Sequence, residues 1–305
     1  MREAFKRWAN PSSPHAEGRA ARAALEDARE RIKVALGWGH ELIFTSGASE
    51  ALATAIVRST GDACIVSAVE HDAVQRSAPN AFFLPVGVDG LVARDALYGR
   101  LAALGAKQPL VAIQHVNNEI GVIQPLEDLG QVVREAGGIL LADCAQSAGK
   151  IALPDAGIIA VSAHKMGGPP GIGALLIRDL GLIEPSGGQE KGYRPGTENL
   201  PSALGFAAAA EANRGWLARA ADLRAHLDGA IEAAGGTIVA RNAPRIATIA
   251  NYRMPRRGPS ASARTWCINS VASATPTRHP RASPASTGPR RCAGRTISSA
   301  IPNTA

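Results

Sequence analysis

The sequence predicts an α/β fold, with a mostly parallel sheet and helices on both faces. Short apolar runs alternate with helix-like patterns through residues 1–254, which is typical of strands joined by crossover helices. The strand-like runs are continuously apolar and do not alternate with polar residues, as expected for a sheet covered on both faces. A chain of 305 residues is long enough to bury the large core that such a sheet requires.

The order of elements follows from local signals along the chain. The first helix is predicted to begin at Ser13 and Pro14, a favourable cap and first residue, and to end at Gly37. Apolar residues at helical spacing predict further helices at 48–58, 71–78, 93–104 and 126–136, and an alanine-rich helical region at 202–234. Apolar runs predict strands at 41–45, 63–67, 81–86, 110–115, 139–142, 157–161, 172–178, 237–240 and 246–251.

The composition changes after Met254. Residues 255–305 contain eight arginines and seven prolines but no lysine, aspartate or glutamate. Residues 1–254 hold 25 basic and 26 acidic residues, so the tail supplies all of the excess in the formal net charge of +7. We expect the tail to be disordered, because it has too little apolar surface to offset chain entropy. Its composition also resembles that of a GC-rich gene translated out of frame.

The chain is therefore expected to have three parts. Residues 1–200 form a large α/β domain, and residues 201–254 form a connecting helix and the start of a small domain that remains incomplete. Residues 255–305 form a tail unrelated to the rest. A nucleic-acid-binding role for the basic tail is a competing hypothesis. It is disfavoured, because the tail has Trp266 as its one aromatic residue and shows no folded module.

Several classes of protein are disfavoured by what the sequence lacks. No apolar run approaches the roughly 18–20 residues of a membrane helix, and the first residues do not form a secretory signal. The four cysteines show neither metal-type spacing nor disulfide density, which favours a cytoplasmic protein without a metal. Motifs for dinucleotides, P-loops, zincins and serine hydrolases are absent.

Two predicted strand ends carry residues suited to anion or ring binding. Ala48 and Ser49 begin a helix directly after a strand, where free N–H groups and a hydroxyl can bind phosphate. The alternative is an ordinary capped turn. His71 follows the next strand, where it could stack on a planar ring, transfer protons or simply begin a helix.

Two further strand ends carry charged residues. Asp143 ends a very apolar strand, and its buried carboxylate needs a cationic partner, either a protonated pyridine nitrogen or a structural salt bridge. Lys165 lies between two apolar strands and precedes a Gly-Gly-Pro-Pro-Gly loop, whereas most lysines are solvated. A lysine in such a place can form a Schiff base. Together the four strand ends supply what is needed to hold pyridoxal phosphate.

The sequence resembles the cysteine desulfurases, in the class V aminotransferase group of fold-type I pyridoxal-phosphate enzymes. The resemblance covers about residues 10–254. Its matching segments are Asn10-Pro11-Ser12-Ser13, His15, Gly18-Arg19, TSGASE at 45–50, Glu70-His71, HVNNEIG at 115–121, Asp143 with Gln146, SAHK at 162–165 and RPGTEN at 194–199.

The resemblance implies a role for each matching residue. Lys165 would hold the cofactor aldehyde and act as general base, and His71 would stack on the ring. Asp143 would keep the pyridine nitrogen protonated, and Gln146 would bond the phenolic oxygen. The remaining implied contacts are phosphate binding by Ala48, Ser49, Ser162 and His164, phosphate binding in the partner subunit of a homodimer by Thr197, and contact with the substrate carboxylate by Asn118.

The implied reaction converts L-cysteine to L-alanine and passes sulfur to an enzyme persulfide, then to an acceptor protein for iron–sulfur cluster or thio-cofactor assembly. Two departures from the family pattern matter. The family's first strand lies upstream of Met1, so we expect Met1 to be an internal start. The persulfide cysteine is not recognisable after Met254, so we expect impaired activity and assign no nucleophile among Cys64, Cys144, Cys267 and Cys292. Alternatives are a selenocysteine lyase, an aminotransferase or an inactive cofactor-binding remnant.

Overall fold

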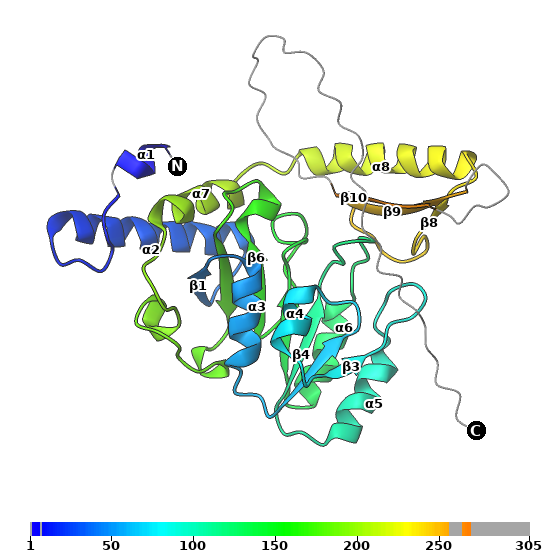
Figure 1. Ribbon diagram of the computed structural model, residues 1–305, viewed down its shortest axis with the longest axis horizontal. Coiled ribbons are helices and arrows are strands. Elements are labelled where there is room, and N and C mark those ends of the chain that lie inside the picture. The colour runs from blue at the N-terminus through cyan, green and yellow to red at the C-terminus, as the bar shows by residue number, and fades with distance from the viewer. Residues whose placement is uncertain (1, 7, 256–263, 270–305) are drawn as a thin grey trace, which may run out of the picture.

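The computed structural model describes residues 2–6, 8–255 and 264–269. Figure 1 shows a large α/β unit and, beside it, a smaller layer in which one long helix lies against three strands. The helices are α1 (Arg2–Lys6), α2 (Ala16–Leu36), α3 (Ala48–Val57), α4 (Asp72–Ser77), α5 (Arg94–Leu104), α6 (Leu126–Glu135), α7 (Leu200–Ala210) and α8 (Trp216–Ala233), with 3₁₀ turns η1 (Ala163–Met166), η2 (Leu180–Leu182) and η3 (Glu190–Gly192).

The large unit contains a seven-stranded sheet in the order β1-β7-β6-β5-β4-β2-β3. Strand β7 runs antiparallel to both of its neighbours, and the other pairs are parallel. The mostly parallel sheet predicted from the sequence is thus confirmed. The strands are β1 (Glu41–Thr45), β2 (Ala63–Ser67), β3 (Phe82–Leu84), β4 (Pro109–Gln114), β5 (Ile139–Asp143), β6 (Ile158–Ser162) and β7 (Gly173–Ile177).

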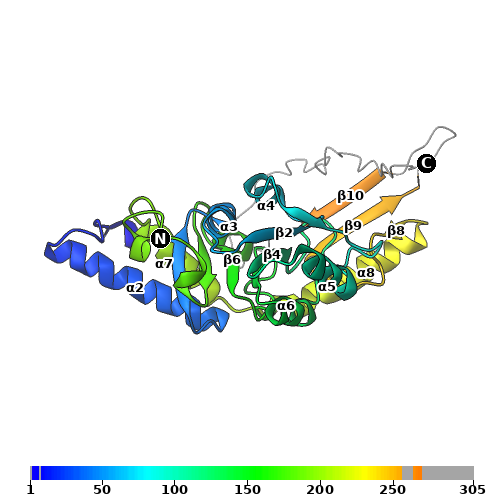
Figure 2. The same cartoon turned by 90° about the horizontal axis from the view of Figure 1, so that it is seen from below.

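Helices cover both faces of this sheet (Figure 2). Successive residues of a strand point to opposite faces, so Leu140 joins one apolar core and Leu141 the other. Helices α2, α5, α6 and α7 pack on the first core, and α3 and α4 pack on the second. This two-sided burial explains why the strands read as continuous apolar runs in the sequence.

The start of α2 differs from the prediction. His15, rather than Ser13, is the cap residue, because its Nδ1 accepts a hydrogen bond from the backbone N–H of Gly18 at 3.1 Å. The predicted end at Gly37 is confirmed, with that glycine in the left-handed conformation at φ 66°. The alanine-rich region at 202–234 also differs, since it divides into α7 and α8.

The smaller unit consists of α8 and a three-stranded antiparallel sheet with β9 in the centre. Its strands are β8 (Thr237–Ile238), β9 (Ile249–Met254) and β10 (Arg264–Asn269). Strand β10 lies in the tail that was expected to be disordered, and for this segment the expectation is wrong. Its backbone pairs with β9 over six residues, from Arg264 opposite Met254 to Asn269 opposite Ile249. Residues 256–263 and 270–305 lie outside the described residues.

No helix in the described part of the chain is long and apolar enough to cross a membrane.

A buried ion pair joins α2 to the sheet and to the loop before α7. The guanidinium of Arg29 contacts both carboxylate oxygens of Glu190, at 2.7 and 2.9 Å, and both side chains are almost fully buried. Glu190 also accepts a hydrogen bond from the backbone N–H of Phe44 in β1 at 2.8 Å. Glu190 has a positive φ of 50°, so these contacts hold a strained backbone in place.

We expect Arg29→Ala to lower the free energy of unfolding by about 3–5 kcal/mol, because it leaves the Glu190 carboxylate buried and unpaired. The matched control is Arg31→Ala, on the same helix, which removes an exposed ion pair with Glu211. The control should cost less than about 1 kcal/mol. Urea denaturation followed by circular dichroism measures both, and equal losses would contradict the structural role of the buried pair.

Candidate active site

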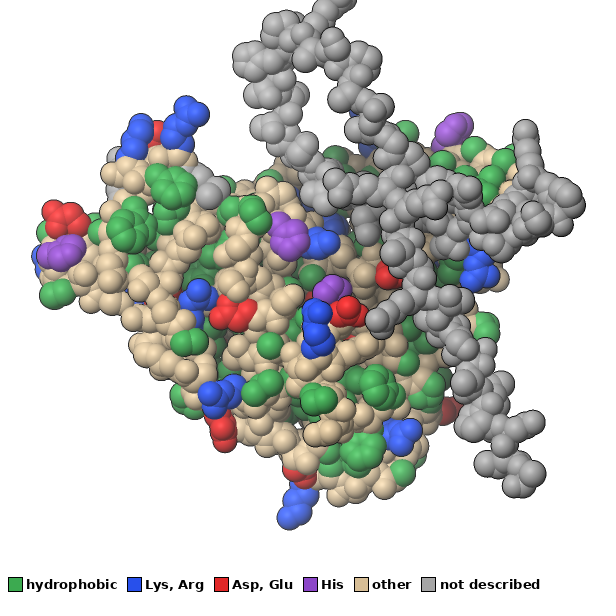
Figure 3. Space-filling view, viewed as in Figure 1, with side chains coloured by type: hydrophobic (Ala, Val, Ile, Leu, Met, Phe, Trp, Pro, Cys, Tyr) green, Lys and Arg blue, Asp and Glu red, His purple; other side chains and the backbone are tan. Residues whose placement is uncertain are grey.

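A cavity of about 480 Å³ lies at the carboxyl ends of the parallel strands β4, β5 and β6. This edge of an open α/β sheet is where such folds bind ligands. In the space-filling view of Figure 3, basic, acidic and histidine side chains gather near the centre of the face shown. Every site residue predicted from the sequence except Thr197 lines the cavity: Ala48, Ser49, His71, Asn118, Asp143, Gln146, Ser162, His164 and Lys165.

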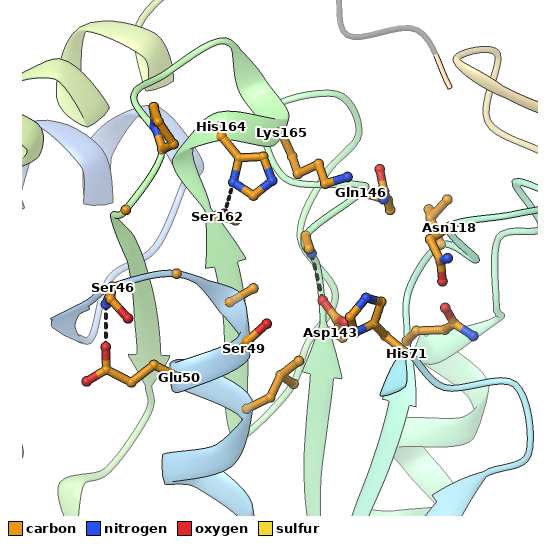
Figure 4. A pocket seen from close by; sticks show the side chains of 18 residues that line it. Ser46, Ser49, Glu50, His71, Asn118, Asp143, Gln146, Ser162, His164 and Lys165 are labelled. Atoms are coloured by element: carbon orange, nitrogen blue, oxygen red, sulfur yellow. Dashed lines mark hydrogen bonds between the residues drawn. The ribbon is translucent and has the colours of Figure 1, made fainter. Parts of the chain in front are cut away.

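One end of the cavity is built to bind an anion. Helix α3 begins there after Gly47, and no side chain caps its free N–H groups. Ser49 of its first turn lines the cavity at this end (Figure 4). At the end of β6, Ser162 adds a hydroxyl that is hydrogen-bonded to Nδ1 of His164 at 2.8 Å. The positive end of a helix dipole with hydroxyl donors beside it suits a phosphate group.

The other end holds a buried carboxyl group. Asp143 ends β5, is 8% exposed and accepts a hydrogen bond from the backbone N–H of Ala145 at 2.9 Å. Burial raises the pKa of Asp143, and that hydrogen bond together with the nearby His71 and Lys165 opposes the rise. Among the described residues, no lysine or arginine forms a salt bridge with Asp143. The observation disfavours the structural salt bridge that the sequence left open and leaves a carboxyl group suited to a cationic ligand atom.

In Figure 4 the His71 ring lies beside this carboxyl group, and Lys165 lies above it. His71 begins helix α4, one of the roles considered for it, by accepting a hydrogen bond from Ala73 N–H at 3.1 Å, and it also lines the cavity. Because Nδ1 is the acceptor, a neutral ring carries its proton on Nε2. Lys165 belongs to the 3₁₀ turn after β6, is half-buried and extends toward Gln146.

These residues fit pyridoxal phosphate. The start of α3 with Ser49, Ser162 and His164 would hold the phosphate, and Asp143 would face the pyridine nitrogen. His71 would cover the ring, Gln146 would reach the phenolic oxygen and Lys165 would take the aldehyde. The buried carboxyl of Asp143, which no cationic side chain of the described chain pairs with, is the observation that most requires such a ligand.

The sequence interpretation missed other residues of the cavity. Gln114 ends β4 beside Asp143, and its position as a polar residue at the end of a buried strand was the available signal. Glu50 accepts a hydrogen bond from the backbone N–H of Ser46 and lies 3.6 Å from Arg194. It therefore joins the anion-binding end to the RPGTEN segment, a contact that local sequence does not reveal. The other lining residues missed are Gly47, Leu52, Val116, Ala145, Pro170 and Gly171.

The predicted residue Thr197 and the cysteines Cys64 and Cys144 do not line the cavity. Thr197 is exposed, in the loop between η3 and α7. Cys64 is half-buried in β2, and burial raises the pKa of its thiol to about 11. Cys144 directly follows Asp143 and is fully buried, and burial raises the pKa of its thiol strongly. Both thiols stay protonated, as packing residues do. Cys267 belongs to β10, and Cys292 lies outside the described residues.

Comparison with known proteins decides the family. The sequence profile described as aminotransferase class-V matches residues 1–259, most of the chain.

The chain belongs to the class-V aminotransferases.

Named relatives of this class-V chain are cysteine desulfurases. The cysteine desulfurase IscS of Dictyoglomus turgidum is 37% identical over 227 residues, which cover 68% of this chain and 57% of that relative. The chain thus spans little more than half the length of such relatives. Among solved structures, a NifS-like protein from Rickettsia africae has a TM-score of 0.79 at 28% identity and covers 84% of this chain and 77% of its own. A structure titled SspA in complex with cysteine has a TM-score of 0.71 at 28% identity and covers 82% and 76%.

The comparisons confirm the predicted family resemblance, the fold-type I architecture and pyridoxal phosphate as the cofactor of this class-V chain.

The backbone of Gly173 lies close to the start of α3, at the anion-binding end of the cavity. A Cβ atom at this residue of β7 would lie 2.5 Å from the carbonyl oxygen of Val161 and 2.8 Å from the backbone of Gly47. We expect Gly173→Ala to displace the start of α3 and to weaken pyridoxal-phosphate binding at least about tenfold, a loss of about 1.4 kcal/mol. Equilibrium dialysis measures the affinity.

The matched control is Gly99→Ala in α5, where a Cβ would meet nothing within 4 Å. It should leave cofactor affinity unchanged and raise the free energy of unfolding by about 0.5–1 kcal/mol, because alanine favours helix. Normal affinity in Gly173→Ala would show that the start of α3 does not hold the phosphate.

Proposed function

We propose that this chain is a pyridoxal-phosphate-dependent cysteine desulfurase. The observation that carries the proposal is the single cavity in which an anion-binding helix start, Lys165, His71 and the buried Asp143 meet. The names of the relatives support the same activity, and one structural neighbour is described in complex with cysteine.

Different side chains around the cavity have different roles in the proposed reaction. Bound pyridoxal phosphate supplies a ring that withdraws electrons from the substrate α-carbon. Asp143 holds a proton at the ring nitrogen, and the carboxylate of L-cysteine binds near Asn118. Lys165 removes the proton from the substrate α-carbon. The 3₁₀ turn that carries Lys165 holds it close to that carbon. His71 excludes water from one face of the ring.

The overall reaction balances with a thiol as sulfur acceptor. The Cβ–S bond of L-cysteine breaks, the sulfur joins the acceptor sulfur as a persulfide, and Cβ gains a proton to give L-alanine. Neither Cys64 nor Cys144 lines the cavity. We therefore propose that this chain transfers sulfur slowly unless a thiol other than those of Cys64 and Cys144 reaches the cavity.

The remaining expectations belong to the same proposal. The enzyme acts in the cytoplasm as a homodimer in which Thr197 binds the phosphate of the partner subunit. It passes sulfur to an acceptor protein for iron–sulfur cluster or thio-cofactor assembly. Residues 1–200 form the cofactor-binding domain, 201–254 the connecting helix and the start of the small domain, and 255–305 a tail outside the family. The exposure of Thr197 in a single chain supports its role across an interface.

The cofactor assignment predicts a yellow protein whose colour depends on Lys165. We expect purified protein with added pyridoxal phosphate to absorb in the visible range, and Lys165→Ala to lose the covalent link to the cofactor. Borohydride reduction followed by peptide mass spectrometry detects that link. Lys107→Ala, an exposed lysine away from the cavity, is the control and should behave as the parent. A labelled Lys107, or no labelled peptide in the parent, refutes the assignment.

The activity is tested with L-cysteine and dithiothreitol as the acceptor thiol. We expect alanine and sulfide in equal amounts, and a loss of about 10²–10⁴-fold in Asp143→Asn, because the neutral side chain cannot hold the proton at the ring nitrogen. Pyruvate in place of alanine would point to a lyase, and cofactor binding without either product would leave only a binding protein. Alanine and sulfide are quantified by chromatography and colorimetry.

A further inference from the structure

Glu70 is a buried carboxyl group that the proposed reaction does not use. It lies in the turn after β2, one residue before His71, and is 6% exposed. Its Oε1 accepts hydrogen bonds from the hydroxyl of Ser67 and, at 2.8 Å, from the backbone N–H of Gln114 at the end of β4. Glu70 therefore connects the turn that carries His71 to the neighbouring strand.

A second contact holds the same turn. The side-chain amide of Gln114 donates a hydrogen bond to the carbonyl oxygen of Val69, one residue before Glu70. Asn117 reaches that carbonyl at 3.4 Å. With both the side chain of Glu70 and the carbonyl of Val69 attached to β4 and the loop after it, the position of His71 follows from the position of β4.

Glu70 is also linked to Asp143 through β4. Gln114, which donates to Glu70, is the register partner of Asp143 across β4 and β5. Two buried carboxyl groups whose charges act on each other cannot both ionise at low cost. Burial raises the pKa of Glu70 to about 8, the hydrogen bonds from Ser67 and Gln114 oppose this rise, and the charge of Asp143 adds to it.

The two oxygens of Glu70 differ in their hydrogen bonds. Oε1 accepts two hydrogen bonds, as a carbonyl-type oxygen does. Oε2 is buried and has no hydrogen-bond partner within the described residues. An ionised Glu70 would keep charge on a buried oxygen that no donor contacts, whereas the neutral acid leaves only an uncharged hydroxyl there, which is the less costly of the two.

We propose that Glu70 is the protonated member of a carboxyl pair with Asp143, positioning His71 over the ring while leaving the negative charge to Asp143. The positioning of His71 over a ring rests on the proposed function, and the protonation of Glu70 does not. The charged and titratable groups around the pair are His71 of the same turn and Lys165 of η1, both of which favour an ionised Asp143.

The protonation is tested by the pH dependence of unfolding. The folded chain keeps a proton on Glu70 that the unfolded chain releases above its ordinary pKa of 4.5. Raising the pH from about 5 to about 8 must then increase the unfolding constant by up to about tenfold per pH unit through this group. Glu70→Gln, which stays neutral at every pH and keeps an accepting oxygen, should lack this component.

Urea denaturation of the full-length parent, Glu70→Gln and Glu70→Ala at several pH values gives the comparison. Glu135→Gln, an exposed glutamate at the end of α6, is the control and should show the pH slope of the parent. If the unfolding constant rises less with pH in Glu70→Gln than in the parent, the proposal is supported. Parallel profiles for the parent and Glu70→Gln overturn it.

The positioning role is tested by pyridoxal-phosphate affinity in the same variants. We expect Glu70→Ala to bind the cofactor at least about tenfold more weakly than the parent and Glu70→Gln to recover most of that loss. Equal weakening in both variants would show that a charged Glu70 is needed and would overturn the proposal. If the parent itself does not bind pyridoxal phosphate, the proposed function fails, and the unfolding profiles still decide whether Glu70 is protonated.

Discussion

The register of β4, β5 and β6 is the constraint on which the site depends. Asp143 pairs with Gln114 on one side and with Ala160 on the other, and Ser162 pairs with Gly173, which also pairs with Thr45. One edge of the sheet thereby receives a carboxyl group, an amide and a hydroxyl from separate parts of the sequence. A shift of one residue in any of these strands would turn its polar end to the opposite face. The shift would also exchange the residues that pack in the two apolar cores, so each core would receive side chains of a different size and shape.

Much of this arrangement could be predicted from the sequence because its causes are local. Fully buried strands are continuous apolar runs, so 41–45 and 63–67 were predicted with the bounds that the structure shows. The polar residues that follow those runs marked the cavity, since parallel strands bring their carboxyl ends to one edge. The family resemblance then implied roles that spacing alone left open. For His71, for example, it implied stacking on the ring, whereas the spacing was equally consistent with a residue that only begins a helix.

What could not be predicted depends on contacts between distant segments. Glu190 is buried because Arg29, far away in the sequence, meets it beneath β1, and nothing near either residue indicates the pair. Strand β10 was missed because its structure comes from the backbone of β9, whereas a composition rich in arginine and proline argued for disorder. The start of α2 was misplaced because serine followed by proline is the commoner signal, while here a histidine ring nitrogen serves as the cap.

The position of β1 has a consequence for synthesis on the ribosome. Glu41 of this strand pairs with Ile177 of β7, so β1 finds its hydrogen-bonding partner only after most of the sheet has been translated. At elongation rates of about 5–20 residues per second the wait is on the order of ten seconds. During that interval the apolar residues of β1 and α2 are exposed to chaperones and to other nascent chains. The order of the strands thus determines how long the newly made protein is vulnerable to aggregation.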